Sequence, residues 1–355
     1  MGSIYQIGNL ALRLFPPETA HGLALRGLSS GLGPRERADD FPVLEQTLFG
    51  LRFANPVGVS AGFDKNAVAV TGVARLGGGF IEVGGVTPRS QAGNPRPRLF
   101  RLTPDRAAIN RLGFNNDGAD AVRARLETHR ASGNALLPIG INLAANATSA
   151  DPAQDFIDLV AGFAQAGDYL TIDVSCPNTE NGQVFLEPRA LEDLLARLNA
   201  ARDASGARPA MVAKLAPDLE AGHLRELITI IVAAGVDAIT LCNTTTARPK
   251  SLASPHAKER GGLSGTPLFE MSNAMLRKVY NQTGGTVPLI GVGGIMSGAD
   301  AYTKIRAGAS LVQLYTGLVY GGPGLVQRIK RDLADALARD GHANIIEAVG
   351  SEHRT

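Results

Sequence analysis

The sequence predicts an α/β protein built as a single (β/α)₈ TIM barrel with a two-helix extension at its N-terminus, and three observations support this prediction. Eight short apolar runs recur between residues 56 and 315, and helix-like patterns alternate with them. No GxGxxG motif follows the first run, as a doubly wound nucleotide-binding sheet would have. The length of 355 residues is one that α/β barrels commonly reach as a single domain.

Each predicted strand is a continuous apolar run rather than an alternating one, which is typical of a parallel strand buried on both faces. The predicted strands are 56–61, 79–86, 138–143, 169–176, 210–215, 238–243, 288–293 and 310–315. The helical patterns between them cover 153–166, 190–204, 219–234, 268–282 and 298–307. A hairpin is predicted at 46–53, and the long insertion at 87–115 is predicted to be functional or to contain an extra strand pair.

Residues 1–40 differ from the barrel region at 41–355. An apolar stripe that begins at Ile4 predicts one amphipathic helix ending before Pro16, and a second stripe covers residues 20–28. Arginines lie on or near both stripes. The pair is expected either to pack on the barrel or to dip its apolar faces into lipid while the arginines meet anionic headgroups, and the two roles are compatible.

Composition excludes several classes of protein. Lys plus Arg number 35 and Asp plus Glu 33, so the net charge of +2 gives no general reason to bind nucleic acid. Cys176 and Cys242 lack CxxC spacing, which argues against a disulfide scaffold or a zinc site and favours a reducing compartment. None of the six histidines has HxxxH or HExxH spacing, so no metal site is expected. The longest apolar runs are too short to span a bilayer.

Glycine is concentrated after the last two predicted strands. Gly293 ends the seventh predicted strand and Gly294 follows it, while Thr316 and Gly317 follow the eighth. Barrels commonly bind phosphate at these two loops, because glycine lets backbone N–H groups approach phosphate oxygens. The GGLSG run at 261–265 adds small residues nearby. The sequence therefore predicts a phosphate-binding site at this face of the barrel.

The polar residues at the other strand ends supply candidates for catalysis. Cys176 lies at a strand end, where barrel enzymes carry out their chemistry, and a thiol can accept a proton near neutral pH; the alternative is an inert core cysteine. Lys214 lies in an apolar run and is expected to point inward, either as a cation beside a flavin ring or as a Schiff-base amine. Cys242 is interpreted as a packing or backbone-level contact.

Several motifs occur in the order found in one known family. They are AGFDK at 61–65, GNPRPR at 93–98, INRLGFN at 109–115, SCPNT at 175–179, NTT at 243–245, GGLSG at 261–265 and IGVGG at 290–294. Together they resemble dihydroorotate dehydrogenase over nearly the whole chain. The run PETAH at 17–21 is similar to the helical cap of the quinone-dependent class.

The resemblance implies oxidation of dihydroorotate to orotate in pyrimidine biosynthesis. Cys176 would take the C5 proton while hydride passes from C6 to FMN, and electrons would then leave to a membrane quinone. FMN would be held by Ala61, Gly62, Lys65, Gly85, Asn142, Asp173, Lys214, Cys242, Ser264, Gly265, Gly293, Gly294, Tyr315 and Thr316. The substrate would contact Lys65, Asn110, Leu112, Gly113, Phe114, Asn178, Asn243 and Thr244. The quinone would enter near His21, Arg101 and Tyr315.

The sequence departs from the family pattern at three places. Cys176 stands where the quinone-dependent class usually has serine, and cysteine is typical of the soluble class. Asp173 stands where the pattern has asparagine, and a carboxylate there is unfavourable unless it is protonated or paired with a lysine. ENGQ at 180–183 replaces the usual Gly-Leu-Arg run.

Other functions stay open at this point. The cysteine favours a soluble acceptor such as fumarate or another pyrimidine substrate, whereas the N-terminal helices favour quinone. A flavin-free lyase that uses Lys214, and a non-catalytic membrane-bound barrel, are further alternatives. No transit segment is evident, so we expect a peripheral protein on the cytoplasmic side of a bacterial inner membrane, either monomer or homodimer.

Overall fold

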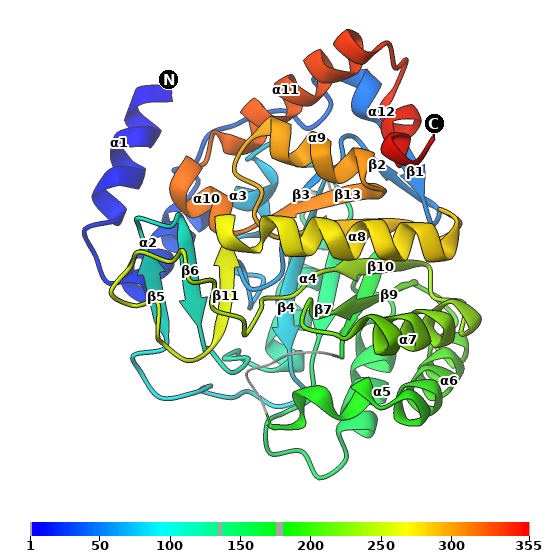
Figure 1. Ribbon diagram of the computed structural model, residues 1–355. Helices are drawn as coiled ribbons and strands as arrows, with labels where there is room; N and C mark the ends of the chain where they lie inside the picture. Colours follow the sequence, from blue (N-terminus) through cyan, green and yellow to red (C-terminus); the bar gives the residue numbers. More distant parts are fainter. Residues whose placement is uncertain (1, 134–136, 175–179, 355) are drawn as a thin grey trace.

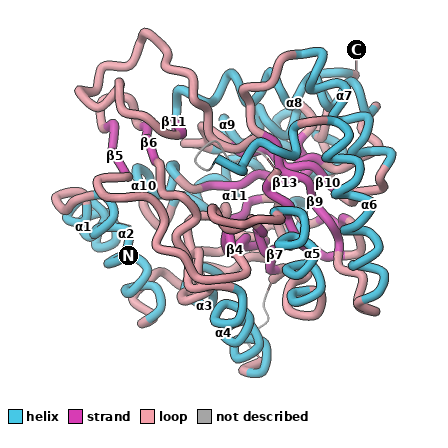
Figure 2. Tube along the Cα trace, turned by 90° about the horizontal axis from the view of Figure 1, so that it is seen from below, coloured by secondary structure: helices cyan, strands magenta, loops and turns pink. Residues whose placement is uncertain are grey.

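The computed structural model describes residues 2–133, 137–174 and 180–354, and its centre is a closed barrel of eight parallel strands. Each strand pairs with the next one along the chain, and β13 pairs with β3 to close the ring. Figure 2 shows the strands gathered in the middle with helices around them. The strands are β3 (Val57–Val59), β4 (Phe80–Val86), β7 (Ile139–Leu143), β8 (Tyr169–Asp173), β9 (Ala210–Leu215), β10 (Ala238–Leu241), β12 (Leu289–Val292) and β13 (Ala309–Leu314).

The predicted (β/α)₈ barrel is thereby confirmed, and all eight predicted strands are present. Their bounds agree within two residues, except that the predicted end of β8 at 176 lies outside the described residues. The agreement follows from burial, since nearly every residue of these strands is inaccessible to solvent. A strand covered on both faces is apolar throughout its length, which makes it visible as a run in the sequence.

Helices follow the strands and cover the outside of the barrel (Figure 1). Local capping defines their ends: Asp151 accepts a hydrogen bond from the Gln154 backbone at the start of α5, and Gly284 ends α8 in the left-handed conformation. The α-helices of the barrel are α3 (Val70–Ala74), α4 (Ala119–Ala131), α5 (Pro152–Phe163), α6 (Pro188–Ala204), α7 (Ala221–Ala233), α8 (Phe269–Thr283), α9 (Gly298–Arg306), α10 (Thr316–Gly321), α11 (Leu325–Asp340) and α12 (Ile345–Ala348). The 3₁₀ turns are η1 (Pro42–Leu44), η2 (Glu180–Leu186), η3 (Thr266–Leu268) and η4 (Ser351–His353).

An antiparallel hairpin of β1 (Gln46–Leu48) and β2 (Leu51–Phe53) closes the N-terminal end of the barrel. Phe53 is fully buried, and its ring meets the edge of Phe80 at a centroid distance of 5.5 Å. Phe49 meets Tyr169 at 6.1 Å. These aromatic pairs fill the barrel floor, so any site in the barrel lies at the opposite end.

A second, three-stranded antiparallel sheet stands beside the mouth of the barrel. It consists of β5 (Leu99–Leu102), β6 (Ala107–Asn110) and β11 (Gly262–Gly265) in the order β11-β6-β5. The insertion at 87–115 therefore does hold the expected strand pair. Most of the glycine run at 261–265 is strand β11. Glycine is required there, since a Cβ on Gly262 would lie 1.9 Å from Thr244 Oγ1.

Two helices precede the barrel, α1 (Gly2–Leu12) and α2 (Pro17–Ser29). Figure 1 shows α1 at the outer edge of the molecule and α2 next to the small sheet. Helix α2 packs against α3 and β5, and a Cβ on Gly72 would lie 2.2 Å from the carbonyl oxygen of Leu28. Large apolar side chains on and after α1 stay exposed, including Leu10 at 64% and Leu14 at 86%.

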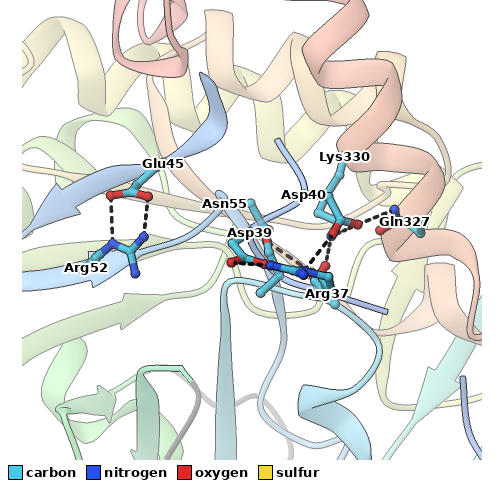
Figure 3. Close-up of polar contacts among 10 residues, drawn as sticks. Arg37, Asp39, Asp40, Glu45, Arg52, Asn55, Gln327 and Lys330 are labelled. Atoms are coloured by element: carbon cyan, nitrogen blue, oxygen red, sulfur yellow. Dashed lines mark hydrogen bonds and ion pairs between the residues drawn. The ribbon is translucent and has the colours of Figure 1, made fainter. Parts of the chain in front are cut away.

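The segment that joins α2 to the barrel is bound to the barrel surface (Figure 3). Asn55 Nδ2 donates to the carbonyl oxygen of Ala38 at 2.8 Å. Lys330 Nζ on α11 donates to the carbonyl oxygen of Arg37 and lies 3.6 Å from Asp40 Oδ2. Gln327 Nε2 donates to the same carboxylate at 2.7 Å. Residues 37–40 are therefore part of the barrel's packing even though they precede its first strand.

Candidate active site

A cavity of about 670 Å³ opens at the C-terminal ends of the barrel strands and continues beneath α1 and α2. It lies at the face where barrel enzymes place their chemistry. Every predicted site residue within the described ranges lines it. These residues are His21, Ala61, Gly62, Lys65, Gly85, Arg101, Asn110, Leu112, Gly113, Phe114, Asn142, Asp173, Lys214, Cys242, Asn243, Thr244, Ser264, Gly265, Gly293, Gly294, Tyr315 and Thr316. Cys176 and Asn178 lie outside the described residues.

Small residues from three elements meet at one end of this cavity. Gly293 and Gly294 follow β12, and both have positive φ angles, 113° and 76°. A Cβ on Gly294 would lie 2.5 Å from Phe269 Cβ, so only glycine fits the loop against α8. Ser264 and Thr316 contribute hydroxyl groups that are 2.8 Å apart. The loop thus exposes backbone and hydroxyl groups in the way that phosphate binding requires.

Lys214 and Asp173 form an ion pair in the wall of the cavity. They are register partners on β9 and β8, and Lys214 Nζ lies 3.8 Å from Asp173 Oδ2. Asn243 Nδ2 donates to both oxygens of Asp173, at 3.1 and 3.3 Å. Both charged side chains are more than 90% buried. Of the two ways to accommodate a carboxylate at 173, the structure has the pairing with lysine.

Asn142 is held from below by a buried polar network inside the barrel. Its Nδ2 donates to Glu82 Oε1 at 3.2 Å. The other oxygen of Glu82 accepts hydrogen bonds from Gln313 at 2.8 Å and from the Tyr169 hydroxyl at 3.2 Å. Burial, followed by the charge of Glu82, raises the pKa of Tyr169 well above its ordinary value, so Tyr169 is a donor. The network fixes the orientation of the Asn142 amide.

Lys65 and His21 lie on the side of the cavity nearest to α2. Lys65 Nζ donates to the carbonyl oxygen of Gly62 at 2.8 Å, and burial lowers its pKa to about 8. The His21 ring contacts the rings of Phe63 and Tyr315, with centroid distances of 5.5 and 6.0 Å. Burial, followed by the charge of Lys65, lowers the pKa of His21 to about 4. His21 is therefore neutral near pH 7.

Arg101 marks the end of the cavity at the N-terminal helices. Its Nη1 donates to the carbonyl oxygen of Arg13 at 2.8 Å, so it ties β5 to the residue after α1. Arg13 in turn donates to the carbonyl oxygen of Tyr320. His21 and Arg101, both predicted to lie near the quinone, line the cavity at different points: His21 packs between aromatic rings and Arg101 bonds to backbone.

Sequence reasoning missed several lining residues because they belong to ordinary apolar patterns. Leu99, Phe100 and Leu318 face the cavity, yet nothing in their sequence context distinguishes them from core residues; Phe63 faces it too, and its place in the AGFDK motif could have indicated this. Tyr320 was missed as well, although its hydroxyl donates to the carbonyl oxygen of Ala107 at 2.8 Å and so marks a polar point in an apolar wall. These residues share one cavity wall only because the fold brings α10, β5 and the loop after β3 together.

Two further observations, on metal binding and on membrane-spanning helices, concern the part of the chain that the structure describes. Within it, no group of three or more histidine, cysteine, aspartate or glutamate side chains is arranged to hold a metal ion. None of its helices combines the length and the apolarity needed to cross a bilayer.

Known proteins with the same architecture identify the family. The family model for dihydroorotate dehydrogenase matches residues 43–337. A dihydroorotate dehydrogenase (quinone) of Rhodospirillum rubrum is 52% identical over 340 residues, which are 95% of this chain and 92% of the relative. The mitochondrial dihydroorotate dehydrogenase (quinone) of Mus musculus is 45% identical, covering 96% and 88%. The structure of DHODH from Eimeria tenella in complex with ferulenol has a TM-score of 0.92 at 36% identity, covering 96% of both chains. This chain therefore belongs to the dihydroorotate dehydrogenase family, within its quinone-dependent branch.

Proposed function

We propose that this protein oxidises dihydroorotate to orotate with FMN bound at the barrel mouth and passes the electrons to a membrane quinone. The observation that carries the proposal is the continuity of the cavity. One end consists of polar groups at the strand ends, and the other is an apolar passage beneath α1 and α2. A polar pyrimidine and an apolar quinone can thus reach one cofactor from different sides.

The glycine-lined end fits the phosphate of FMN. Gly293 and Gly294 leave their backbone open to a ligand, and Ser264 and Thr316 add hydroxyl groups from β11 and α10. A Cβ on Gly265 would lie 3.1 Å from Thr316 Cγ2, so a larger residue would fill the cradle. When bound, FMN supplies the acceptor for hydride and the route for electrons to leave.

The strand ends provide the groups that bind and orient the substrate. Asn110, Asn243 and Thr244 offer amide and hydroxyl groups suited to the oxygens and N–H groups of a flat pyrimidine. Lys214 places a positive charge where a reduced flavin ring gains negative charge, and Asp173 orients Asn243. Cys176, which follows β8, is the residue we assign to removal of the C5 proton.

The apolar end supports access for quinone from a membrane. Helix α1 and the residues after it expose Ile7, Leu10, Leu14 and Phe15 on the outside of the passage. Such side chains favour burial among acyl chains, and the exposed Arg26 on α2 can meet headgroups. We place the protein at the cytoplasmic face of a bacterial inner membrane, held peripherally by these helices.

Stopped-flow spectroscopy tests the proposal directly. The purified protein should be yellow, dihydroorotate should bleach its flavin absorbance, and a ubiquinone analogue should restore it faster than fumarate does. A colourless, folded protein that does not take up FMN would refute the flavin assignment. Faster reoxidation by fumarate would favour the soluble-acceptor alternative that cysteine at the base position suggests.

The base assignment has its own test. We expect Cys176→Ala to lower the rate of flavin reduction by about a hundredfold or more while FMN stays bound, because general-base catalysis contributes about that much. Cys176→Ser should keep part of the rate. Cys242→Ala tests the other thiol. Burial raises the pKa of the Cys242 thiol to about 12 and leaves it protonated, so a loss of rate in this variant would come from altered FMN binding and not from proton removal. Unchanged reduction in Cys176→Ala would remove this residue from the mechanism.

A further inference from the structure

Lys304 on α9 is a fully buried cation with an unusual set of partners. Its side chain is inaccessible to solvent. Its Nζ donates to Ser272 Oγ at 2.5 Å and to Asn273 Oδ1 at 2.8 Å, and it lies 5.1 Å from the centre of the Phe269 ring. Within the described ranges, no carboxylate oxygen lies within 4.0 Å of this ammonium. All of its close partners are therefore neutral.

Lys330 gives the contrast within the same chain. It is equally inaccessible to solvent, but Asp40 Oδ2 lies 3.6 Å from its Nζ (Figure 3). A buried ammonium is costly unless a negative charge compensates for lost hydration, and neutral hydrogen-bond partners provide only part of that compensation. Burial lowers the pKa of Lys304 to about 8, which reflects the same cost and outweighs the charges of Asp300 and Glu270, which act to raise it. The surroundings of Lys304 are thus suited to an additional anion.

The partners of Lys304 are also the residues on which the glycine loop rests. Ser272 Oγ donates to the carbonyl oxygen of Phe269 at 2.9 Å and lies 3.3 Å from the carbonyl oxygen of Gly293. A Cβ on Gly293 would lie 3.2 Å from Ser272 Oγ, and one on Gly294 would lie 2.5 Å from Phe269 Cβ. A short chain of contacts therefore runs from the ammonium through Ser272 to the backbone at which we place the phosphate.

We propose that Lys304 is the buried counter-charge of the FMN phosphate, acting from behind the Gly293–Gly294 loop through Ser272 rather than by direct contact. This inference rests on the proposed function, because it assumes that FMN binds at that loop. A phosphate monoester carries a charge of about −1.5 to −2 near neutral pH. In the low-dielectric interior behind the loop, the positive charge attracts this group much more strongly than a surface lysine would. Lys304 is a positioning residue that selects flavins with a phosphate.

The test compares two flavins that differ in the phosphate alone. Apo-protein is titrated with FMN and with riboflavin, and binding is followed by quenching of flavin fluorescence. We expect Lys304→Gln to weaken FMN by at least about tenfold, or about 1.4 kcal/mol, and to change riboflavin by less than about twofold. Glutamine is chosen because its amide can still donate to Ser272 and Asn273, so the local packing is kept while the charge is removed.

Two control substitutions test whether the effect depends on the position of Lys304. One removes a different buried lysine, and the other removes an exposed lysine and so changes the net charge equally. Lys330→Gln removes the other fully buried lysine, and Lys278→Gln removes an exposed lysine on α8. Both should leave the ratio of the FMN and riboflavin dissociation constants unchanged. Equal losses of both flavins in Lys304→Gln, or no loss of either, would overturn the inference, as would a Lys304→Gln protein that does not fold when Lys330→Gln does. Failure of the unmodified apo-protein to bind FMN would instead refute the proposed function.

Discussion

The carboxylate of Asp173 lies at the end of β8, where the family pattern led us to expect an asparagine. The structure accommodates it by pairing with Lys214 and by accepting two hydrogen bonds from Asn243. Asp173 thereby contacts both Lys214, which we assign to the flavin, and Asn243, which we assign to the substrate. At the scale of single residues, this substitution is the change with the largest expected effect on the electronics of the site.

Replacing Asp173 with asparagine should make the bound flavin easier to reduce. The substitution removes a negative charge 3.8 Å from Lys214, so more of the lysine's positive field acts on the reduced ring. We expect the two-electron midpoint potential to rise by about 30 mV or more, which corresponds to about 1.4 kcal/mol. Equilibrium titration against redox dyes measures it. Asp218→Asn, whose carboxylate accepts from the Thr246 backbone at 2.8 Å, is the control. A potential that stays the same or falls in Asp173→Asn contradicts the prediction.

His21 predicts a pH dependence of stability. Its folded pKa of about 4 is below its ordinary value of 6.5, because burial and then the charge of Lys65 disfavour the imidazolium. The unfolded chain therefore binds more protons between pH 6.5 and 4, and stability falls as the pH is lowered through that window. The expected loss at pH 4 is on the order of 2–3 kcal/mol.

Urea unfolding at pH 7, 5.5 and 4.5 measures this effect. His21→Gln should flatten the dependence above pH 4.5, since glutamine does not titrate. Glu18 affects stability at a lower pH than His21 does. Burial raises the pKa of Glu18, but hydrogen bonds and charges from Arg98 and Arg96 outweigh burial and lower this pKa to about 2. The stability it contributes is lost as the pH falls from 4.5 toward 2, so the two windows can be separated. If the free energy of unfolding changed equally with pH in the parent and in His21→Gln, His21 would not be the source of the pH dependence.

At the scale of elements, α2 is joined to the barrel by one acidic residue between two arginines. Glu18 Oε1 accepts from Arg98 Nη2 at 2.7 Å and from Arg96 Nη2 at 3.0 Å. The two arginines differ in burial, because the Arg98 side chain is 7% exposed and that of Arg96 is 73% exposed. Arg98 Nη1 also donates to the carbonyl oxygens of Ala92 and Asn94. The buried arginine therefore connects α2 with the insertion that precedes β5.

Arg98→Gln and Arg96→Gln form a matched pair of substitutions. We expect Arg98→Gln to destabilise the protein by about 3–5 kcal/mol, because it leaves partly buried groups without a charged partner. Arg96→Gln should cost less than about 1 kcal/mol, since exposed ion pairs contribute little. Hydrogen exchange in α2 should become faster in the first variant and stay near the parent rate in the second. Similar exchange rates in both variants would show that burial of the arginine does not anchor α2.

At the scale of the whole molecule, the boundary between helical cap and barrel matters for any truncation. Residues 37–40 bond to Asn55, Gln327 and Lys330 on the barrel (Figure 3). A chain that begins at 34 keeps these contacts, whereas one that begins at 41 leaves the ammonium of Lys330 buried without Asp40. Breaking such a buried pair costs about 3–5 kcal/mol.

Deletion of residues 1–33 should therefore separate the two half-reactions. We expect flavin reduction by dihydroorotate within about threefold of the full chain, while kcat/KM for a quinone analogue falls at least about tenfold and binding to anionic vesicles is lost. Vesicle sedimentation and stopped-flow kinetics measure the two effects. Deletion of 1–40 serves as the comparison and should lower the melting temperature further, because Lys330 then loses Asp40 as well. A 1–33 deletion that still reduces quinone at the full rate would exclude the helices from quinone access.

The sequence was sufficient for the barrel and the family, because both leave local signals. Buried strands such as Ile139–Leu143 are apolar runs, and the glycine at 293 marks a loop that has to approach a ligand. Contacts between distant segments leave no such signal. The pairing of Gly262 with Asn110 spans 152 positions, and the local sequence at neither residue indicates it. Lys304 has the pattern of an ordinary amphipathic helix, and only the fold shows that its charge faces inward.

The hairpin at the floor of the barrel restricts how the holoprotein is assembled. Phe53, Phe80 and Tyr169 seal that end, and a molecule as large as a nucleotide cannot pass between their rings. FMN bound as we propose would have to enter through the opposite mouth, over which His21 and the rest of α2 lie. We therefore expect α2 to move aside, or to reach its place late, when the cofactor is loaded.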